Sequence, residues 1–155
     1  MTHISIIGPG RLGRSLARLF KQADYRVTLV RQVQDEPVSD IRILTVPDRL
    51  IHDVAQELPK DRPTIHCSGT LPDSVLEGHH PYGRIHPLMT FPGPDVGMPG
   101  EGRVFAAISG DIEGKRLCVS LATDIGFTPF DAPENLSAYH AAAVVAGNFA
   151  AILLR

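Results

Sequence analysis

Six residues near the start of the chain have the composition and spacing of a phosphate-binding turn. The segment Gly8-Pro9-Gly10-Arg11-Leu12-Gly13 follows a short apolar run and opens a helical pattern. Gly8 permits a tight turn, Gly10 lets the backbone approach a pyrophosphate, and Gly13 lets the helix pack close to the strand. The anion then lies on backbone N–H groups at the positive helix end, the alternative being a turn that merely requires glycine. The residues predicted to contact a cofactor here are Gly8, Gly10, Arg11, Leu12 and Gly13.

The residue after the second predicted strand indicates which dinucleotide the turn binds. In dinucleotide-binding folds this strand, here Arg26 to Val30, usually ends in an acidic residue that binds the adenosine ribose. Arg31 takes that position, and a guanidinium pairs with a 2′-phosphate through two parallel hydrogen bonds. The sequence therefore favours NADP, with NAD less favoured and an exposed surface arginine as the alternative. Val46 and Pro47, at the end of another strand, complete the predicted cofactor contacts.

Polar and reactive side chains gather at the ends of two further predicted strands. His66-Cys67-Ser68-Gly69 ends one of them, and His86 lies in the strand-like segment Arg84 to Phe91. Pro87 restricts His86 to an extended conformation, which fixes the direction of its imidazole. The alternative is that Cys67 is a small buried hydrophobe and His66 a satisfied core histidine.

Spacing and charge exclude several function classes. His79 and His80 lie in a polar turn and are expected to face solvent, and no metal site is predicted because no His or Cys ligand spacing is present. The 15 Lys and Arg residues are interspersed with 17 Asp and Glu residues, so no nucleic-acid footprint is visible. No apolar run approaches the roughly 20 residues of a membrane span. Two cysteines are too few for a disulfide framework. We therefore expect a cytoplasmic protein that binds neither nucleic acid nor membrane.

Apolar strands that alternate with amphipathic helices predict an α/β, Rossmann-like fold with a mostly parallel sheet. One segment departs from the usual pattern: Gln32 to Asp40 contains Pro37 and leaves no room for a helix, yet Ile41 to Val46 reads as a buried strand. About ten extended residues span roughly 33 Å, enough to return to the other side of the sheet. We infer that the second crossover helix and the third strand are deleted, which leaves Arg26 to Val30 at the sheet edge.

Two later helices have recognisable ends. Asp48 is expected to cap a helix that runs through Leu58. Asp111 is expected to cap another, which Gly126 ends.

The last stretch, Ser137 to Arg155, is helical by composition and apolar on nearly every face. Such a helix is stable only where both sides are covered, so we expect one side to pack on the sheet and the other on a second copy in a homodimer. Aggregation of a truncated chain is the alternative. We divide the chain into a dinucleotide-binding domain, residues 1–132, and a C-terminal helix, residues 133–155, which is a remnant or the start of a helical dimerisation domain.

The same helix carries two polar candidates. His140 and Asn148 lie on one side of it, roughly 12 Å apart, so both could border one cleft. Hydrogen bonds between packed helices are the alternative use of these side chains.

Taken together, these motifs resemble Rossmann-like oxidoreductases of the 6-phosphogluconate-dehydrogenase-like superfamily and, within it, an uncharacterised family. The resemblance covers essentially the whole chain and implies an NAD(P)-binding domain followed by a helical dimerisation domain, with the active site between them. The segments that carry it are Gly8 to Gly13, Val46-Pro47-Asp48, His66 to Gly69, His86-Pro87-Leu88, and Tyr139-His140-Ala141-Ala142 with Asn148.

Two departures limit what the resemblance implies. Only the first helix of the expected helical domain is present, and Val144 stands where the hydroxyacid dehydrogenases of the superfamily place a lysine. Lysine-assisted alcohol oxidation is therefore not expected. The His86-Pro87-Leu88 segment is similar to the His-Pro-Met segment of prephenate dehydrogenases, whose histidine contacts the substrate hydroxyl that loses its proton. The likeness implies that role for His86.

The sequence thus predicts an NADP-dependent oxidoreductase, or a remnant of one, that transfers a hydride to or from a small-molecule substrate. In this hypothesis His86 or His140 handles the proton, while Asn148 and Ser68 hold a carbonyl or carboxylate. The alternative is a non-catalytic dimeric module that binds a nucleotide or acts as a scaffold. Fold resemblance alone does not decide between them, because function resides in the site.

Overall fold

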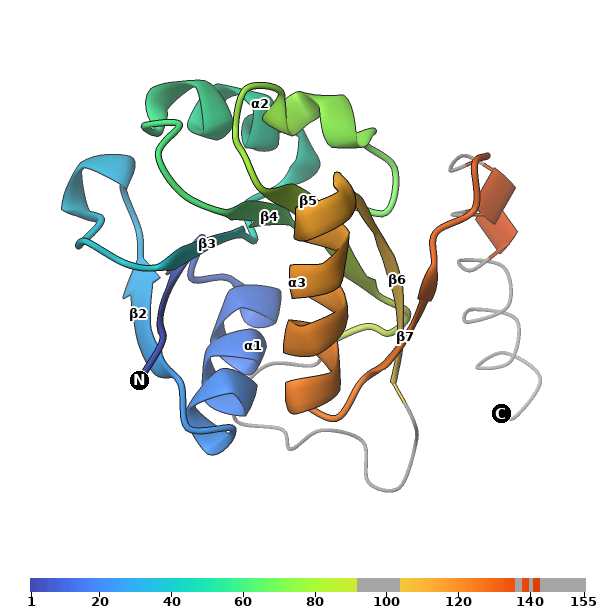
Figure 1. Ribbon diagram of the computed structural model, residues 1–155, viewed down its shortest axis with the longest axis horizontal. Coiled ribbons are helices and arrows are strands. Elements are labelled where there is room, and N and C mark those ends of the chain that lie inside the picture. Colours follow the sequence, from blue (N-terminus) through green and yellow to red (C-terminus); the bar gives the residue numbers. More distant parts are fainter. Residues whose placement is uncertain (92–103, 136–137, 140, 143–155) are drawn as a thin grey trace.

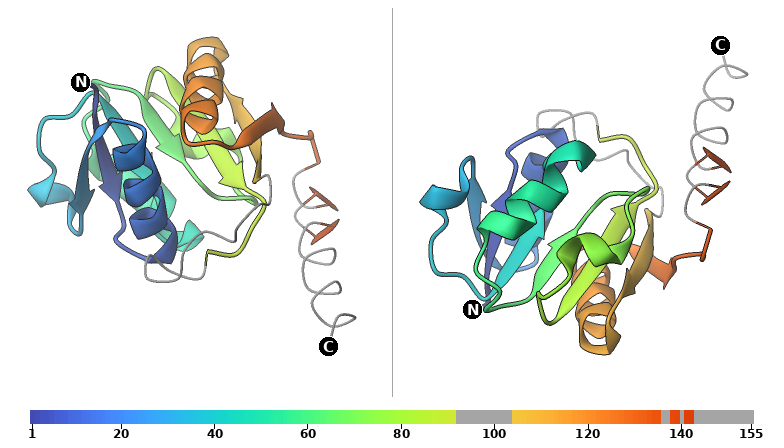
Figure 2. Two further views of the ribbon diagram at one scale, coloured as in Figure 1. Left: turned by 90° about the horizontal axis from the view of Figure 1, so that it is seen from below. Right: turned by 90° about the horizontal axis from the view of Figure 1, so that it is seen from above.

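The computed structural model describes residues 1–91, 104–135, 138–139 and 141–142. Within them one seven-stranded sheet has the order β2-β1-β3-β4-β5-β6-β7. The helices α1 and α3 cover one face, and α2 and the 3₁₀ helix η2 cover the other (Figures 1 and 2). The strands are β1 (His3–Ile7), β2 (Arg26–Val30), β3 (Ile41–Leu44), β4 (Thr64–His66), β5 (Tyr82–Pro87), β6 (Phe105–Gly110) and β7 (Thr128–Asp131). The helices are α1 (Arg11–Gln22), α2 (Asp48–Glu57), α3 (Ile112–Asp124), η1 (Val33–Asp35) and η2 (Asp73–Leu76).

The sheet is mostly parallel, as predicted, and β2 lies at its edge. Strand β1 pairs in parallel with β2 on one side and with β3 on the other, so β2 is the edge strand. The connection from β2 to β3 holds the single short turn η1 instead of a crossover helix. Strand β6 runs antiparallel to β5 and pairs in parallel with β7 through the crossover helix α3. The predicted Rossmann-like α/β fold is confirmed.

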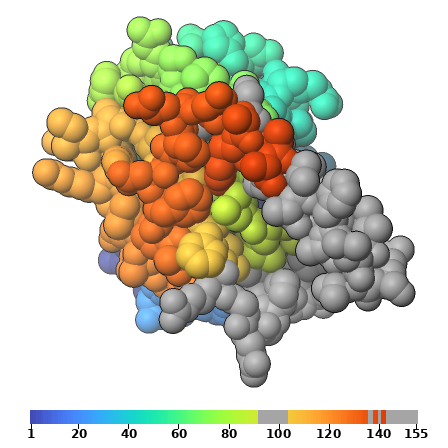
Figure 3. Space-filling view, turned by 90° about the vertical axis from the view of Figure 1, so that its right-hand side faces the viewer, coloured from blue at the N-terminus to red at the C-terminus, as the bar shows by residue number. Residues whose placement is uncertain are grey.

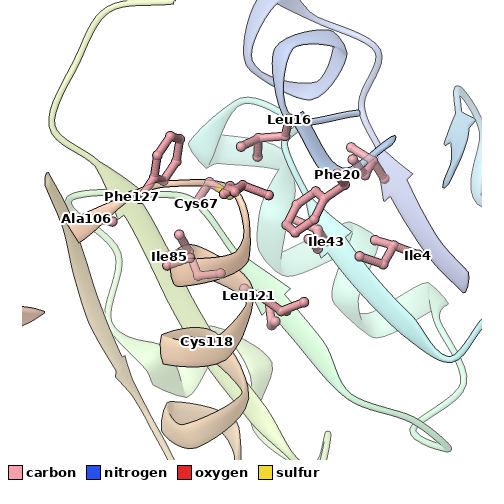
Figure 4. Close-up of a cluster of buried hydrophobic side chains, with 14 of the residues drawn as sticks. Ile4, Leu16, Phe20, Ile43, Cys67, Ile85, Ala106, Cys118, Leu121 and Phe127 are labelled. Atoms are coloured by element: carbon pink, nitrogen blue, oxygen red, sulfur yellow. The ribbon is translucent and has the colours of Figure 1, made fainter. Parts of the chain in front are cut away.

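Apolar residues on both faces hold the helices against the sheet. On the α1 and α3 face, Leu16 and Phe20 of α1 and Leu121 of α3 pack against isoleucines of the central strands (Figure 4). On the other face a second cluster joins Ile51 of α2 and Leu76 of η2 to the sheet. The central strands are buried on both faces, and their buried positions include the polar residues Ser5, Arg42 and His66 as well as the isoleucines.

A buried ion-pair network holds the shortened connection in place. The Arg42 side chain is 1% exposed; its Nε donates to both carboxylate oxygens of Glu36, at 2.8 and 2.9 Å. Its Nη1 donates to the Pro59 carbonyl and to Asp61. Residue 42 lies on β3, Glu36 follows η1, and the other two partners lie between α2 and β4. The network therefore ties the β2–β3 connection to the loop between α2 and β4.

The structure confirms one predicted helix cap and corrects two other expectations. Asp111 accepts a hydrogen bond from the Gly114 N–H at 2.6 Å at the start of α3, and Gly126 has a φ of +81° just after that helix. Asp48, by contrast, makes no cap hydrogen bond, because it is the first residue of α2 and its carboxylate is used elsewhere. His79 does not face solvent: it is fully buried and bonded to Thr64 and to the Ala55 carbonyl.

No helix in the described part of the chain is both long and apolar enough to cross a bilayer.

Candidate functional site

The predicted site residues come together because four parallel strands end at one edge of the sheet. In register, Ile7 of β1 lies beside Leu44 of β3, Leu44 beside His66 of β4, and His66 beside Arg84 of β5. The residues that follow these positions therefore emerge at the same edge, where ligands bind in open α/β sheets. The glycine turn, Val46-Pro47, Ser68 and His86 all belong to this edge.

The structure explains glycine at two of the three glycine positions of the turn. Gly8 has a φ of +111°, and its N–H donates to the Val30 carbonyl of β2. A Cβ on Gly13 would lie 2.1 Å from the Gly8 carbonyl oxygen, so only glycine lets α1 approach the strand. A Cβ on Gly10 would meet nothing within 4 Å. The packing of the described residues therefore does not require glycine at position 10.

The other predicted cofactor contacts surround this turn. Arg11 is exposed at the first position of α1, and Arg31 is exposed directly after β2. Leu12 packs partly against the core. The sequence did not indicate that Arg14 braces the turn, but its Nε donates to the Pro9 carbonyl at 2.9 Å.

Ser68 lies in a loop that is held by its own hydrogen bonds. Its hydroxyl donates to Asp48 at 2.7 Å and accepts the N–H groups of Thr70 and Leu71 at 3.1 Å. The Thr70 hydroxyl donates to the same Asp48 oxygen. The Ser68 hydrogen is thus given to Asp48 and not directed to a ligand. The carboxylate that the sequence assigned to a helix cap fixes this loop instead.

His86 is oriented by the end of the neighbouring strand. Its Nδ1 lies 3.1 Å from the Cys67 carbonyl, which can only accept, so in the neutral ring Nδ1 carries the hydrogen and Nε2 the lone pair. The Tyr139 ring packs edge-on against it, with the ring centroids 6.1 Å apart. On the side of the molecule drawn in Figure 3, the segment after β7 lies beside the end of β5. A neutral imidazole in this orientation can accept a proton.

Cys67 itself is a core residue. It is buried in the cluster between the sheet and the α1 and α3 helices (Figure 4). Burial raises the pKa of its thiol to about 12, which keeps the sulfur protonated and non-nucleophilic at neutral pH. This agrees with the alternative that treats Cys67 as a small buried hydrophobe.

A buried polar cluster that sequence reasoning missed lies one step below His86 on the same face. His66 of β4, Arg84 of β5 and Ser109 of β6 are register neighbours, and Asp73 of η2 covers them. Ser109 donates to Asp73 Oδ1 at 2.8 Å, while His66 Nε2 and Arg84 Nε each lie 3.6 Å from that oxygen. Burial lowers the pKa of His66, so the ring stays neutral. The sequence feature that could have indicated this cluster is the alternation of polar and apolar residues in these strands.

His140 and Asn148, the remaining predicted catalytic residues, lie outside the described residues, as does most of the C-terminal segment. Within the described ranges, no group of three or more His, Cys, Asp or Glu side chains is placed to hold a metal ion.

One surface hollow lies away from this edge. It measures about 380 Å³ and is lined by Thr2, Ala23, Asp24, Tyr25 and Asp124. These residues lie at the amino ends of β1 and β2 and at the end of α3, opposite the glycine turn. The hollow is therefore not part of the candidate site.

Comparison with known proteins supports the class of fold that this edge defines. No protein-family model matches the chain, and no curated protein matches it either. Among solved structures, it is similar to "putative NADP oxidoreductase BF3122" from Bacteroides fragilis, with a TM-score of 0.77 and 22% identity over 98% of this chain and 69% of that one. The shared architecture is the Rossmann-like fold.

Two further structures show the same likeness. Protein TM1727 from Thermotoga maritima has a TM-score of 0.74 and 26% identity, over 97% of this chain and 65% of that one. A prephenate dehydrogenase from A. aeolicus, solved with hydroxyphenyl propionate and NAD+, has a TM-score of 0.67 and 14% identity, over 84% and 59%. The chain spans about two thirds of the length of the first two proteins.

Proposed function

We propose that the chain binds a nicotinamide dinucleotide on the turn from Gly8 to Gly13. The observation that carries this proposal is the open space at Gly10, since a side chain there would meet no protein atom within 4 Å. Glycine at this position is explained by a ligand that approaches the backbone, as a pyrophosphate does. The N–H groups at the start of α1 and the positive end of its dipole would hold the anion. NAD in the A. aeolicus structure supports the same class of cofactor.

We further infer that the cofactor is NADP. Arg31 is exposed. It lies next to the turn, because the carbonyl of the preceding Val30 accepts the Gly8 N–H at 3.0 Å. A guanidinium at this place suits a 2′-phosphate, which an acidic residue would repel. Val46 and Pro47, at the end of β3, are assigned to the same cofactor site.

The proposed activity is oxidoreduction of a small-molecule substrate. When bound, the cofactor supplies or accepts the hydride. His86 accepts or returns the substrate proton through Nε2, since the Cys67 carbonyl holds its other nitrogen. His140 and Asn148 are proposed to complete the site from the C-terminal helix. Membership of the 6-phosphogluconate-dehydrogenase-like superfamily, with shortening of its usual plan, is part of this proposal.

We also propose that residues 133–155 form a homodimer contact next to a domain of residues 1–132. The support is the all-round apolar composition of the segment. Light scattering after size exclusion tests this assignment, and a monomer would contradict it.

Cofactor binding is tested by thermal shift with NADPH, NADP, NADH and NAD. Ligand at 100 times its dissociation constant stabilises the folded state by about 2.7 kcal/mol. A clear rise in Tm is therefore expected with NADPH and NADP, which carry the 2′-phosphate. An unchanged Tm at millimolar ligand would overturn the proposal.

One observation favours the alternative of a non-catalytic nucleotide-binding or scaffold module. Because β2 is the edge strand, the adenine side of the site lacks the flanking strand of a full Rossmann half. Cofactor binding without any hydride transfer to a panel of carbonyl and imine substrates would support this module.

A further inference from the structure

Buried polar atoms without a partner concentrate in one place. In the described part of the chain, four buried side-chain polar atoms have no hydrogen-bond partner: Ser5 Oγ, His66 Nε2, Arg84 Nε and the Tyr139 hydroxyl. Two of the four, His66 Nε2 and Arg84 Nε, belong to the polar cluster below His86, and a third is the hydroxyl of Tyr139, whose ring packs against His86. His66 and Arg84 are paired across β4 and β5, and the charge of Arg84 acts on the Tyr139 phenol. Buried polar atoms are nearly always hydrogen-bonded, so this concentration calls for an explanation.

All three of these atoms can donate a hydrogen bond. His66 Nδ1 accepts the Ser68 N–H at 3.2 Å, so the neutral ring carries its hydrogen on Nε2. Arg84 has five N–H donors on a side chain that is 4% exposed, yet within the described residues this side chain makes a single hydrogen bond, from Nη1 to the Leu71 carbonyl at 3.1 Å. The Tyr139 hydroxyl can also donate. What the cluster lacks is an acceptor.

In the described part of the chain the Asp73 carboxylate faces these donors, and it does not meet this need. Asp73 Oδ1 is 3.6 Å from His66 Nε2 and from Arg84 Nε, beyond hydrogen-bond length, and it already accepts the Ser109 hydroxyl. Its carboxylate is 24% exposed, so this side of the cluster reaches the surface. Asp73 offsets part of the Arg84 charge but leaves the Tyr139 hydroxyl without a partner.

We propose that Arg84 and Tyr139 bind a carboxylate group of the substrate, with His66 lining the same subsite. Two oxygens of a carboxylate match the planar fork of a guanidinium and accept a phenol hydrogen at the same time. Arg84 lies two residues before His86 on the same face of β5, and the Tyr139 ring contacts His86. A molecule held here by its carboxylate extends toward the imidazole. The assignment of this ligand as a substrate rests on the proposed oxidoreductase function.

Fluorine NMR of the full chain labelled with 3-fluorotyrosine tests the subsite directly. The chain has three tyrosines, and Tyr139→Phe identifies the signal of residue 139. Acetate, pyruvate and sulfate are titrated at constant ionic strength, with and without NADP. We expect acetate and pyruvate to shift the Tyr139 signal to saturation while the signals of Tyr25 and Tyr82 stay in place. Those two signals are internal controls in the same sample.

Variants then assign the effect to the cluster. Arg84→Lys keeps the charge but removes the planar fork, and it should weaken acetate binding by about tenfold or more. Arg116→Met removes an exposed arginine of α3 and should leave binding unchanged. Asp73→Asn removes the competing negative charge and should tighten binding several-fold. It also keeps the measurement decisive if Arg84→Lys does not fold.

Three results would overturn the carboxylate subsite. They are the absence of a saturable Tyr139 shift with either carboxylate, as expected if water alone fills the cluster; a response to sulfate only; and an equal response in folded Arg84→Lys. The thermal-shift series with the cofactors is read separately. Carboxylate binding without cofactor binding would refute the proposed function and leave the subsite standing, whereas the reverse would refute the subsite alone.

Discussion

Replacing Gly10 with alanine separates what the fold requires from what a ligand requires. Gly10 is the N-cap residue of α1, with φ −73° and ψ −172°, a conformation that alanine adopts without strain. Removing glycine flexibility from the unfolded chain stabilises by about 0.4–1 kcal/mol, while alanine is the poorer N-cap by roughly 0.5–1 kcal/mol. These effects offset each other, so the free energy of unfolding should change by less than about 0.5 kcal/mol.

The same substitution should impair cofactor binding. The new methyl group occupies the open space in front of the turn, where the proposal places the pyrophosphate. Forcing one methyl group into a filled site costs about 1–3 kcal/mol, which corresponds to a roughly 5- to 150-fold weaker affinity. Urea unfolding measures the first quantity, and titration followed by NADPH fluorescence measures the second.

Gly13→Ala is the matched control. Its methyl group would lie 2.1 Å from the Gly8 carbonyl oxygen and 2.6 Å from Thr45 Oγ1, so the unfolding free energy should fall by about 2–3 kcal/mol. If Gly10→Ala binds NADPH as tightly as the wild type, the assigned phosphate contact is refuted. A loss of stability in Gly10→Ala as large as in Gly13→Ala would refute the reasoning from open space.

Three further predictions concern the cofactor, the buried ion pair and the histidines. Arg31→Asp should weaken NADPH binding more than NADH binding, and equal effects in the two titrations would contradict the 2′-phosphate contact. Glu36→Ala leaves the buried Arg42 guanidinium without its main partner and should cost about 3 kcal/mol in urea unfolding; a loss below about 1 kcal/mol would show that the pair is dispensable. Burial lowers the pKa of His66 and His79, so the unfolded chain takes up protons first, and stability should fall as the pH drops below about 6.5. His79→Gln should flatten this pH dependence of the urea midpoint, and an unchanged slope would contradict it.

The sequence by itself determined the parts of this protein that depend on local patterns. The glycine spacing predicted the turn, because the positive φ of Gly8 and the close packing at Gly13 require glycine at fixed offsets from one strand and one helix. The short Pro37-containing segment after β2 likewise predicted that β2 lies at the sheet edge, since it has no room for a helix while about ten extended residues suffice to return to the other side of the sheet. Apolar periodicity located α1 and α3 for the same local reason.

Only the tertiary structure decided how polar residues are used. Asp48 appeared as a helix cap, but its carboxylate binds Ser68 and Thr70 from another loop. His79 appeared exposed in a polar turn, yet Thr64 and the Ala55 carbonyl satisfy it in the interior. The sequence does not show whether a polar side chain will be hydrated or will hydrogen-bond to a partner from a distant segment.

The proposed subsite, made of the cluster of His66, Asp73, Arg84 and Ser109 together with Tyr139, shows this most clearly. Its members come from three strands, a 3₁₀ helix and the segment after β7, and no spacing along the chain connects them. Their proximity follows from strand register and from the antiparallel pairing of β5 with β6, which the local pattern does not encode. The glycine turn could therefore be recognised in the sequence, whereas the proposed carboxylate subsite required the assembled sheet.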